Sequence, residues 1–529
     1  MSLTGGDGSA AGPAAGAPQA TRRRRVGGRR RHVVITPACP GTADDRKRSS
    51  SRGVDPSNRF AGSLHCSFRD RPRRDPNHSS SVPPPVVAAA PRARELPLLG
   101  AFPGLLRHRL DRLEALRRRH GEIYALDLPG APIVLCHPSH AQHVFRDNVA
   151  NYRKGGNFWA ILRELLGDGI IVSEGERWLR QRRLMQPQFH RQRIAEMMET
   201  IVGAVAESLE SWPREDPRLN ITARMSEITM QVITRTMFGD HITQREVGQI
   251  AEWLTIIQRY TMIGVLAHGL PGWIPIPGRR RFLAARTAIR DLVAQLIARQ
   301  RVDGADASSL VALLSAVVDA ETGEPMSDLQ ILDEAVGIFL AGYETTALAL
   351  SWGVYLLMRH PAAMARLKAE VRDNLGDRRL TLADLPRLPY SRQILMESMR
   401  LYPPASWLPR VAAEDDVIDG VRIPAGATVL LPIYVYHRHP ELWSDPEAFN
   451  PDRFGAAESE GRHGFAFIPF GAGQRLCIGK ELALLEGQSA LVMMAQRFQF
   501  ERLDDRPVRP LPTSNLTPQG GVWARVRPA

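Results

Sequence analysis

The sequence predicts a mainly α-helical protein with minor β-structure, and three features of its 529 residues lead to this prediction. Apolar residues recur at helical spacing through most of the chain after residue 100, as amphipathic helices require. Alternation typical of strands is confined to two places, one before residue 137 and one after Tyr402. A helix of more than thirty residues is expected between Ser327 and Pro361, and its residues 335–358 are apolar all round, which is typical of a helix at the centre of a large domain.

The first ninety residues differ in composition from the rest of the chain. Residues 1–94 contain 18 Lys and Arg against 6 Asp and Glu, whereas the remainder contains 51 basic and 50 acidic residues. The body is therefore nearly neutral, and its charge indicates no nucleic-acid partner. The first segment is rich in Ala, Gly, Pro, Ser and Arg and lacks apolar periodicity. We therefore expect a disordered extension, 1–90, before a single domain, 91–529.

Three interpretations of this extension remain open. It could be a solvated segment without function, for instance one that results from a start site assigned too far upstream. It could be a basic interaction tail. A targeting peptide is a third interpretation, but no apolar segment follows the arginines, as such a peptide would require.

The four cysteines, at positions 39, 66, 136 and 477, are scattered through the chain. They form no CxxC pair and no spacing typical of a zinc ribbon or of a disulfide framework. This usage is typical of a reducing compartment, so a cytoplasmic location is expected.

Ordered structure is expected from about residue 96. Leu105–Arg119 carries leucines on one helical stripe, and "GEIYALDLPGAPIVLC" alternates like two strands around Pro129 and Gly130. Further helices are predicted at Ala141–Asn148, Arg177–Gln186, Gln192–Ser211, Ser226–Phe238, Ile242–Leu266 and Arg279–Val302.

Ser327 is a plausible N-cap for the long apolar helix, and Pro361 ends it. Glu344 lies near its centre, and an acid in the middle of a bilayer costs about 2.5–3.5 kcal/mol. We therefore interpret the segment as a buried helix and expect no transmembrane anchor.

Near the C-terminus, one cysteine lies in the glycine-rich stretch "FGAGQRLCIG", residues 470–479. A thiolate is a soft, strong ligand that suits a haem iron, and backbone N–H groups brought close by glycines can tune it. An arginine two residues earlier can pair with a haem propionate. Without further motifs, an inert buried cysteine would explain the residue equally well.

The stretch resembles the haem-binding signature of the cytochrome P450 family, F-x-x-G-x-R-x-C-x-G, at every fixed position, and the resemblance extends over roughly residues 95–529. It implies the cytochrome P450 fold, with the long central helix over a haem (heme b, iron protoporphyrin IX). By the same resemblance, Cys477 is the proximal iron ligand and Arg475 a propionate ligand. Phe470 packs near the thiolate, while Gly473 and Gly479 allow the tight loop.

A second motif lies in the long helix, "AGYETT". It resembles the oxygen-activation stretch of the family, which implies that Thr345 hydrogen-bonds dioxygen and that Glu344 relays protons. Ala341 and Thr345 are four residues apart and share one helix face. Small residues at 341 and 342 are expected to let the helix approach a flat cofactor.

Glu397 and Arg400 are three residues apart and can pair on one helix face. Arg453, in "FNPDRF", completes a Glu–Arg–Arg cluster that the family uses to hold its fold. We interpret these three residues as a buried structural network rather than as catalysts.

The family's W-x-x-x-R helix is matched by Trp178 and Arg182, which are expected to hold a propionate. Arg410, in "LPRVAAED", occupies the position of another propionate partner, and Arg153 or Lys154 is a weaker candidate. Each arginine alone could equally be a solvated surface charge.

His437 and His439, in "YVYHRHP", resemble a metal-ligand pair. We found no third ligand nearby in the sequence and interpret both residues as structural, since locally hydrogen-bonded histidines are common.

The resemblance implies a haem-thiolate monooxygenase that inserts one atom of O2 into a hydrophobic small molecule. No flavin or ferredoxin module is visible in the sequence, so electrons are expected from separate partners. The resemblance to bacterial-type members of the family implies that these are a ferredoxin and a ferredoxin reductase, or an equivalent redox chain. The protein is expected to be a monomer. The alternatives are a peroxide-driven peroxygenase or isomerase of the same fold and a non-catalytic haem-binding sensor, and the pair Glu344 and Thr345 argues against each.

The expected substrate is a fatty acid, a terpenoid or a polyketide, because the segments that line the site in the family are mostly apolar here. These segments are Gly156–Leu166, Gly269–Gly278, Leu340–Thr345, Ala405–Leu408 and Leu516–Pro518. Residues 273–277 could also touch a membrane surface, but we interpret them as a lid over the access channel.

Overall fold

The computed structural model describes residues 88–93, 102–128, 130–212, 218–268, 270–271, 273–302 and 309–529. Most of the expected extension therefore lies outside the described residues. Within the described residues, the first strand, β1 (Ala88–Ala89), lies before the boundary expected after residue 90.

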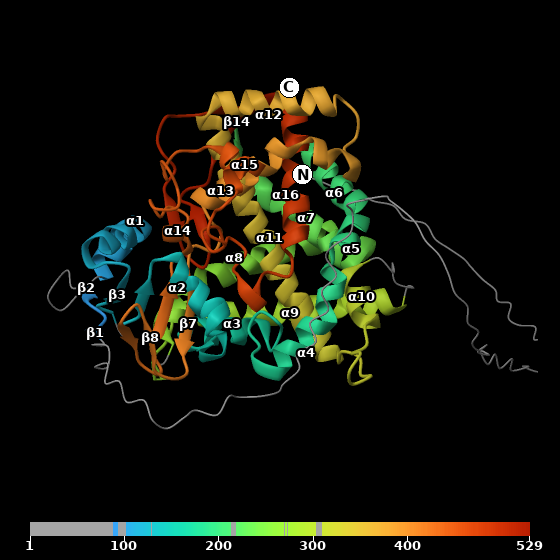
Figure 1. Ribbon diagram of the computed structural model, residues 1–529. Coiled ribbons are helices and arrows are strands. Elements are labelled where there is room, and N and C mark those ends of the chain that lie inside the picture. The colour runs from blue at the N-terminus through green and yellow to red at the C-terminus, as the bar shows by residue number, and fades with distance from the viewer. Residues whose placement is uncertain are drawn as a thin grey trace, which may run out of the picture. The chain divides into compact units, whose positions relative to one another are not determined.

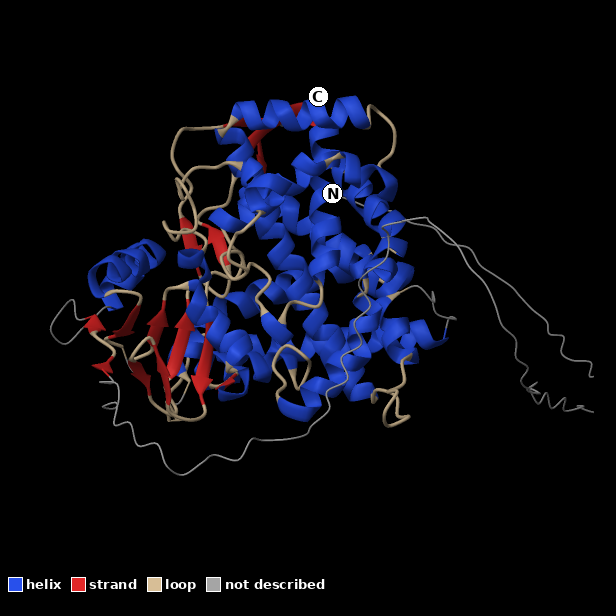
Figure 2. Cartoon of the chain, in the orientation of Figure 1, coloured by secondary structure: helices blue, strands red, loops and turns tan. Residues whose placement is uncertain are grey.

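Helices dominate the described part of the chain, as the sequence predicts (Figure 2). The α-helices are α1 Phe102–His120, α2 Pro138–Gln142, α3 Gly156–Leu166, α4 Gly175–Met185, α5 Arg191–Glu196, α6 Met198–Glu210, α7 Ile221–Phe238, α8 Gln244–Ala267, α9 Arg279–Val302, α10 Leu310–Ala316, α11 Asp328–Arg359, α12 Pro361–Asn374, α13 Pro389–Leu401, α14 Ile433–Tyr436, α15 Ala456–Ser459 and α16 Lys480–Arg497. The expected helix at 192–211 is divided into α5 and α6 at Met197.

The strands are short and gather mainly on one side of the helical region (Figure 2). They are β1 Ala88–Ala89, β2 Arg92–Ala93, β3 Ile123–Leu126, β4 Ile133–Leu135, β5 Tyr152–Arg153, β6 Arg218–Asn220, β7 Leu408–Ala412, β8 Asp416–Ile418, β9 Val421–Ile423, β10 Thr428–Leu431, β11 Phe498–Arg502, β12 Pro510–Pro512, β13 Leu516–Pro518 and β14 Trp523–Pro528. The expected hairpin around residue 130 is confirmed as the antiparallel pair β3–β4.

The largest sheet has the strand order β2-β3-β4-β10-β7-β5. In it, Val429 of β10 pairs with Ile133 of β4 on one side and with Arg410 of β7 on the other. Arg153 of β5 pairs with Val411 of β7. Lys154 is the first residue after β5, and this register therefore brings it close to Arg410 of β7.

The long helix α11 passes through the middle of the helical region and packs against α7, α13 and α16 (Figure 1). Ser327 caps it, because its side chain accepts a hydrogen bond from the Gln330 N–H. The helix ends at Arg359, two residues before Pro361, as predicted. Among the described helices, none is both long enough and apolar enough to cross a membrane.

Candidate active site

The cysteine loop reaches Cys477 through a 3₁₀ turn, Gly473–Arg475, just before α16 begins. The Cys477 N–H donates to the Phe470 carbonyl oxygen at 2.9 Å, which closes the loop. Gly473 has a φ of 65°, and a Cβ there would lie 2.0 Å from the Phe145 carbonyl oxygen. Only glycine fits that position, so the signature's glycine is required by the backbone.

Cys477 is exposed, although it lies deep in the protein. Burial raises the pKa of the thiol, while the backbone N–H groups of Gly479 and Lys480 and the charge of Arg182 lower it. A side chain that is both deep and accessible faces an internal space. Donors at the sulfur suit a thiolate ligand, whose negative charge they stabilise.

Three cations lie close together near this loop. Arg475 donates to the Ser173 carbonyl oxygen at 3.0 Å, forms an ion pair with Glu174 at 3.1 Å and lies over the Trp178 ring at 3.8 Å. Lys154 donates to the Ile171 carbonyl oxygen at 2.6 Å.

The third cation, Arg410, is only 5% exposed and lies over the rings of Phe145 and Trp159, at 5.2 and 5.3 Å from their centroids. Burial lowers the pKa of Arg410 to about 10. The pKa of Lys154 is lowered first by burial and then by the charges of Arg475 and Arg410.

Glu174 is the carboxylate that acts on all three cations. Three cations and one carboxylate leave a net positive charge in a largely buried space. Such a charge is costly unless a further anionic group neutralises it. The two propionates of a haem supply such charge, so the residues present fit this cofactor.

Trp178 and Arg182, which were both expected to hold a propionate, have different contacts. Trp178 lies beneath the Arg475 guanidinium, whereas Arg182 donates to the Leu476 carbonyl oxygen at 2.9 Å and to Gln186 at 2.9 Å. In this arrangement Arg182 holds the backbone of the cysteine loop. Of the two weaker candidates, Arg153 is exposed and Lys154 joins the cationic group.

One face of α11 is open. Ala341 is exposed and Thr345 partly so, in a helix whose other faces are mostly buried. The Thr345 hydroxyl donates to the Ala341 carbonyl oxygen at 2.8 Å. Thr346 is buried and hydrogen-bonds the carboxyl of Glu486 on α16. The expectation that Thr345, rather than Thr346, lies on the face shared with Ala341 agrees with this geometry.

The reason for glycine at 342 differs from the one expected. A Cβ at Gly342 would lie 2.8 Å from Cδ1 of Ile233 on α7. The small residue therefore allows α7 and α11 to pack closely, rather than allowing a cofactor to approach.

Glu344 accepts a hydrogen bond from the Asn515 side-chain amide at 2.6 Å. Burial raises the pKa of Glu344 to about 7, although hydrogen bonds from Asn515 and Gln258 act in the opposite direction. The carboxyl can thus gain and lose a proton near neutral pH, which is the property that a proton relay needs. No sequence pattern pointed to Asn515, which lies between β12 and β13.

The segment before α4 joins α11 to the cysteine loop. The Ile170 N–H donates to Glu334 of α11 at 2.9 Å, and a Cβ at Gly337 would be 3.4 Å from the Ile171 side chain. Two residues further along, the Ser173 carbonyl accepts from Arg475. Because Gly337 lies one helical turn before Ala341, this segment places the open face of α11 near the cationic group.

Glu397 and Arg400 form a bidentate ion pair with distances of 2.6 and 2.8 Å, and both side chains are 0% exposed. Arg453 lies 3.6 Å from Glu397 and donates to the Asp445 carbonyl oxygen. Arg400 also donates to three carbonyl oxygens, those of His437, Pro446 and Ala448. The three residues thus tie α13 to the loops after α14, as a structural network would.

His437 is buried among these groups. Its Nδ1 lies 3.2 Å from the Met399 carbonyl oxygen, and its Nε2 accepts from the Ile468 N–H at 2.9 Å. Burial lowers the pKa of His437 to about 3, so the ring is neutral. Both ring nitrogens are used, which agrees with the structural interpretation of this histidine.

Comparison with known proteins identifies relatives that match most of the chain. The family described as Cytochrome P450 matches residues 91–522. Cyclooctatin synthase of Streptomyces melanosporofaciens is 34% identical over 80% of this chain and 92% of its own length. Cyclooctat-9-en-7-ol 5-monooxygenase of the same organism is 34% identical over 85% of this chain and 96% of its own length.

Among solved structures, the haem domain of cytochrome P450DA aligns with a TM-score of 0.75 and 26% identity over 84% of this chain and 98% of that one. The fold, the sequence match and the monooxygenase relative agree with the geometry described above. The chain therefore belongs to the cytochrome P450 family and is a haem-dependent monooxygenase whose cofactor has a cysteine thiolate ligand.

Proposed function

We propose that Cys477 supplies the thiolate ligand and that Arg475, Lys154 and Arg410 bind the haem propionates. The observation that carries this proposal is the accessible yet deep sulfur beside three cations that share Glu174. When bound, the haem supplies the redox chemistry that activates dioxygen. The loop's N–H groups stabilise the sulfur, and Phe470 and Gly479 shape its surroundings.

Glu344 and Thr345 deliver protons in this proposal. The Glu344 carboxyl carries a proton in about half of the molecules near pH 7, and Asn515 fixes one of its oxygens. The Thr345 hydroxyl uses its hydrogen in the bond to Ala341, so its lone pairs are free to accept a hydrogen bond on the open face. The acid therefore provides the proton, and the alcohol accepts a hydrogen bond from the protonated group or water molecule that carries it.

The substrate in this proposal is a hydrophobic small molecule, such as a terpenoid, a fatty acid or a polyketide. A cavity of about 870 Å³ lies between α3, α8 and the loop before α9, lined by Ile161, Leu270, Trp273 and Ile276 among others. Trp273 is 82% exposed at its mouth. Arg279 fixes the base of this loop through a bidentate pair with Glu164 at 2.6 and 2.7 Å. This arrangement suits a lid over an access channel.

The relative cyclooctat-9-en-7-ol 5-monooxygenase is named for a substrate that is an unsaturated alcohol. An apolar, cyclic or long-chain alcohol is therefore the first class of substrate to test on this chain. Spin-state shifts in the haem spectrum, measured over a library of terpenoids and lipids, identify the members that bind.

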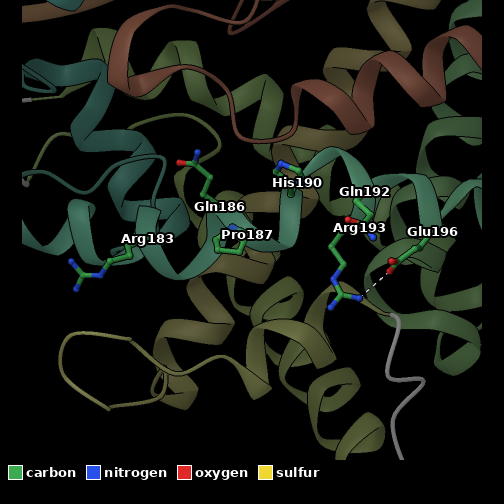
Figure 3. A pocket seen from close by; sticks show the side chains of 7 residues that line it. All are labelled: Arg183, Gln186, Pro187, His190, Gln192, Arg193 and Glu196. Atoms are coloured by element: carbon green, nitrogen blue, oxygen red, sulfur yellow. Dashed lines mark hydrogen bonds and ion pairs between the residues drawn. The ribbon is translucent and has the colours of Figure 1, made fainter. Parts of the chain in front are cut away.

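The monooxygenase reaction also needs electrons, and we propose a ferredoxin with its reductase as the donor. The surface near the cysteine loop has arginines on α4 and α5, and a cavity of about 620 Å³ there is lined by Arg183, His190 and Arg193 among others (Figure 3). Arg193 is paired with Glu196 at 3.0 Å, and Arg183 with Asp319 at 2.8 Å. An acidic partner would compete with these surface pairs, so turnover with a ferredoxin should fall as salt rises.

Replacing Thr345 tests the proton-delivery proposal. Thr345→Ala removes the hydroxyl and favours the helix, because alanine has the higher helix propensity. Oxygen consumption should continue, while product formed per NAD(P)H consumed falls and hydrogen peroxide rises.

Thr345→Ser keeps the hydroxyl and is the matched control, so its coupling should stay close to that of the parent. Equal coupling in the parent and in Thr345→Ala, with a substrate that shifts the spin state, would remove Thr345 from the mechanism.

A further inference from the structure

Three potential metal ligands meet on a part of the protein that the oxidation chemistry does not use. His137 is the N-cap of α2, while His439 and Glu441 lie in the loop after α14. One ligand atom from each lies within 4.8 Å of the other two. Glu441 lies only two residues after His439, whereas His137 is far away along the chain, and the fold alone brings it to the other two.

The hydrogen bonds around His439 leave one ring nitrogen without a partner. Nε2 lies 3.3 Å from Oε1 of Glu122, an arrangement in which the ring N–H donates to the carboxylate. Nδ1 is buried and has no hydrogen-bond partner, in a residue that is 0% exposed. An unpartnered nitrogen in such a place is costly unless something binds it.

His137 offers its other ring nitrogen to the same place. Its Nδ1 lies 2.6 Å from the Ser139 hydroxyl and 3.2 Å from the Ser139 N–H, where it caps α2. Its Nε2 lies 3.9 Å from Oε2 of Glu441. The His137 and His439 ring centroids are 5.1 Å apart, and the rings are nearly perpendicular.

The charges around the cluster favour a cation. Glu441 and Glu122 face it, and the nearest cation, Arg117, lies 3.5 Å from His439 Nε2. Arg117 is already paired with Glu114 at 2.9 Å and with Glu122. The neighbouring His140 is engaged elsewhere, because its Nε2 lies 2.7 Å from Asp419.

We propose that His137 Nε2, His439 Nδ1 and the Glu441 carboxylate bind Zn²⁺, with water as the fourth ligand. Two imidazoles and one carboxylate form a donor set that zinc accepts in tetrahedral geometry, with bonds of about 2.0–2.2 Å. In that geometry the ligand atoms lie about 3.3–3.6 Å apart. Glu441 is 75% exposed, so its carboxylate is free to close the remaining gap.

Two neighbouring groups orient the histidines for this role. The Glu122 carboxylate accepts the His439 Nε2–H, which leaves Nδ1 with its lone pair toward the metal, and such pairs raise ligand basicity. On His137, metal binding through Nε2 requires the tautomer in which Nδ1 carries the hydrogen and donates to the Ser139 hydroxyl, in place of accepting from the Ser139 N–H. The metal would join α2 to the loop after α14, so its role is to stabilise the fold.

The test uses the full-length, haem-loaded protein without a polyhistidine tag. After treatment with a chelator, the protein is dialysed against Zn²⁺ at several concentrations, and zinc per haem is measured. His137→Asn keeps a side chain that caps α2 but loses the Nε2 ligand. Glu441→Gln keeps the shape of the carboxylate and loses its charge. Glu447→Gln is the matched control, because Glu447 is 74% exposed in the same region and lies outside the cluster.

The parent and Glu447→Gln should each bind one zinc, and the temperature of unfolding should rise with zinc in both. His137→Asn and Glu441→Gln should each bind zinc about tenfold or more weakly. Their unfolding temperature should no longer rise with zinc, while their haem content stays unchanged. The proposal is overturned if the parent binds no stoichiometric zinc, or if the two ligand variants bind it as tightly as the parent.

Discussion

Replacement of Glu344 by Gln tests the most specific electrostatic feature of the proposed site. Burial raises the pKa of this carboxyl to about 7. An ordinary glutamate, with a pKa near 4.3, is protonated in only about 0.2% of molecules at pH 7, so burial raises the protonated population roughly 200-fold. If that proton is used, the yield of product per NAD(P)H should follow the protonated fraction. This fraction is about nine tenths at pH 6 and about one tenth at pH 8.

Glu344→Gln keeps an oxygen that can accept from Asn515 but has no proton to give at any of these pH values. Its coupling should therefore be low and nearly independent of pH, whereas that of the parent should fall as the pH rises through about 7. The assay measures product, NAD(P)H and hydrogen peroxide between about pH 6 and pH 8 at constant ionic strength. A parent whose coupling is flat over this range, or a variant with the same profile, would refute the role given to Glu344.

The raised pKa of Glu344 also predicts that the stability of the protein changes with pH. The sign of this change depends on whether the folded or the unfolded state loses the Glu344 proton first as the pH rises. The unfolded chain ionises near the ordinary pKa of glutamate, while the folded protein keeps its proton until about pH 7. Stability conferred by the protonated, buried carboxyl is therefore complete at low pH and is lost as the pH rises to about 7. The loss amounts to at most about 4 kcal/mol. Thermal unfolding of the parent, compared with Glu344→Gln across this range, should show it, and a constant difference would contradict it.

Three further predictions concern the ligand, the structural network and the N-terminal segment. Cys477→Ser should lose the thiolate-haem absorption of the reduced, carbon-monoxide-bound protein together with all monooxygenation, and a variant that keeps that spectrum would show that another residue is the ligand. Glu397→Gln leaves the buried Arg400 guanidinium uncompensated and should destabilise the fold by about 3–5 kcal/mol, measured as a lower unfolding temperature and lower haem content, whereas an unchanged unfolding temperature would contradict a buried ionic network. Deleting residues 1–81, which lie outside the described residues, should leave haem content and turnover nearly unchanged, and a large loss of folded holoprotein would show that this segment is needed.

The sequence by itself determined those features whose residues are neighbours along the chain. The cysteine loop is one, because Gly473, Arg475 and Cys477 are separated by only a few peptide bonds, so their spacing follows directly from the sequence. Helical periodicity similarly predicted that Ala341 and Thr345 share a face. The long helix was evident from its apolar composition, and its two ends from Ser327 and Pro361.

Only the tertiary structure decided which residues from distant segments meet. The register of β5 beside β7 brings Lys154, rather than Arg153, to the cationic group with Arg410. Asn515 reaches Glu344 because β13 packs on α11, and no local pattern records that contact.

The same reason applies to the pairing of His137 with His439 and to the packing that requires glycine at 342. Local sequence fixes dihedral preferences and the face on which a side chain lies. Which residue of a distant segment a side chain meets depends on how whole helices and strands pack. The pKa that burial gives a group such as Glu344 depends on the same packing, which exists only in the folded chain.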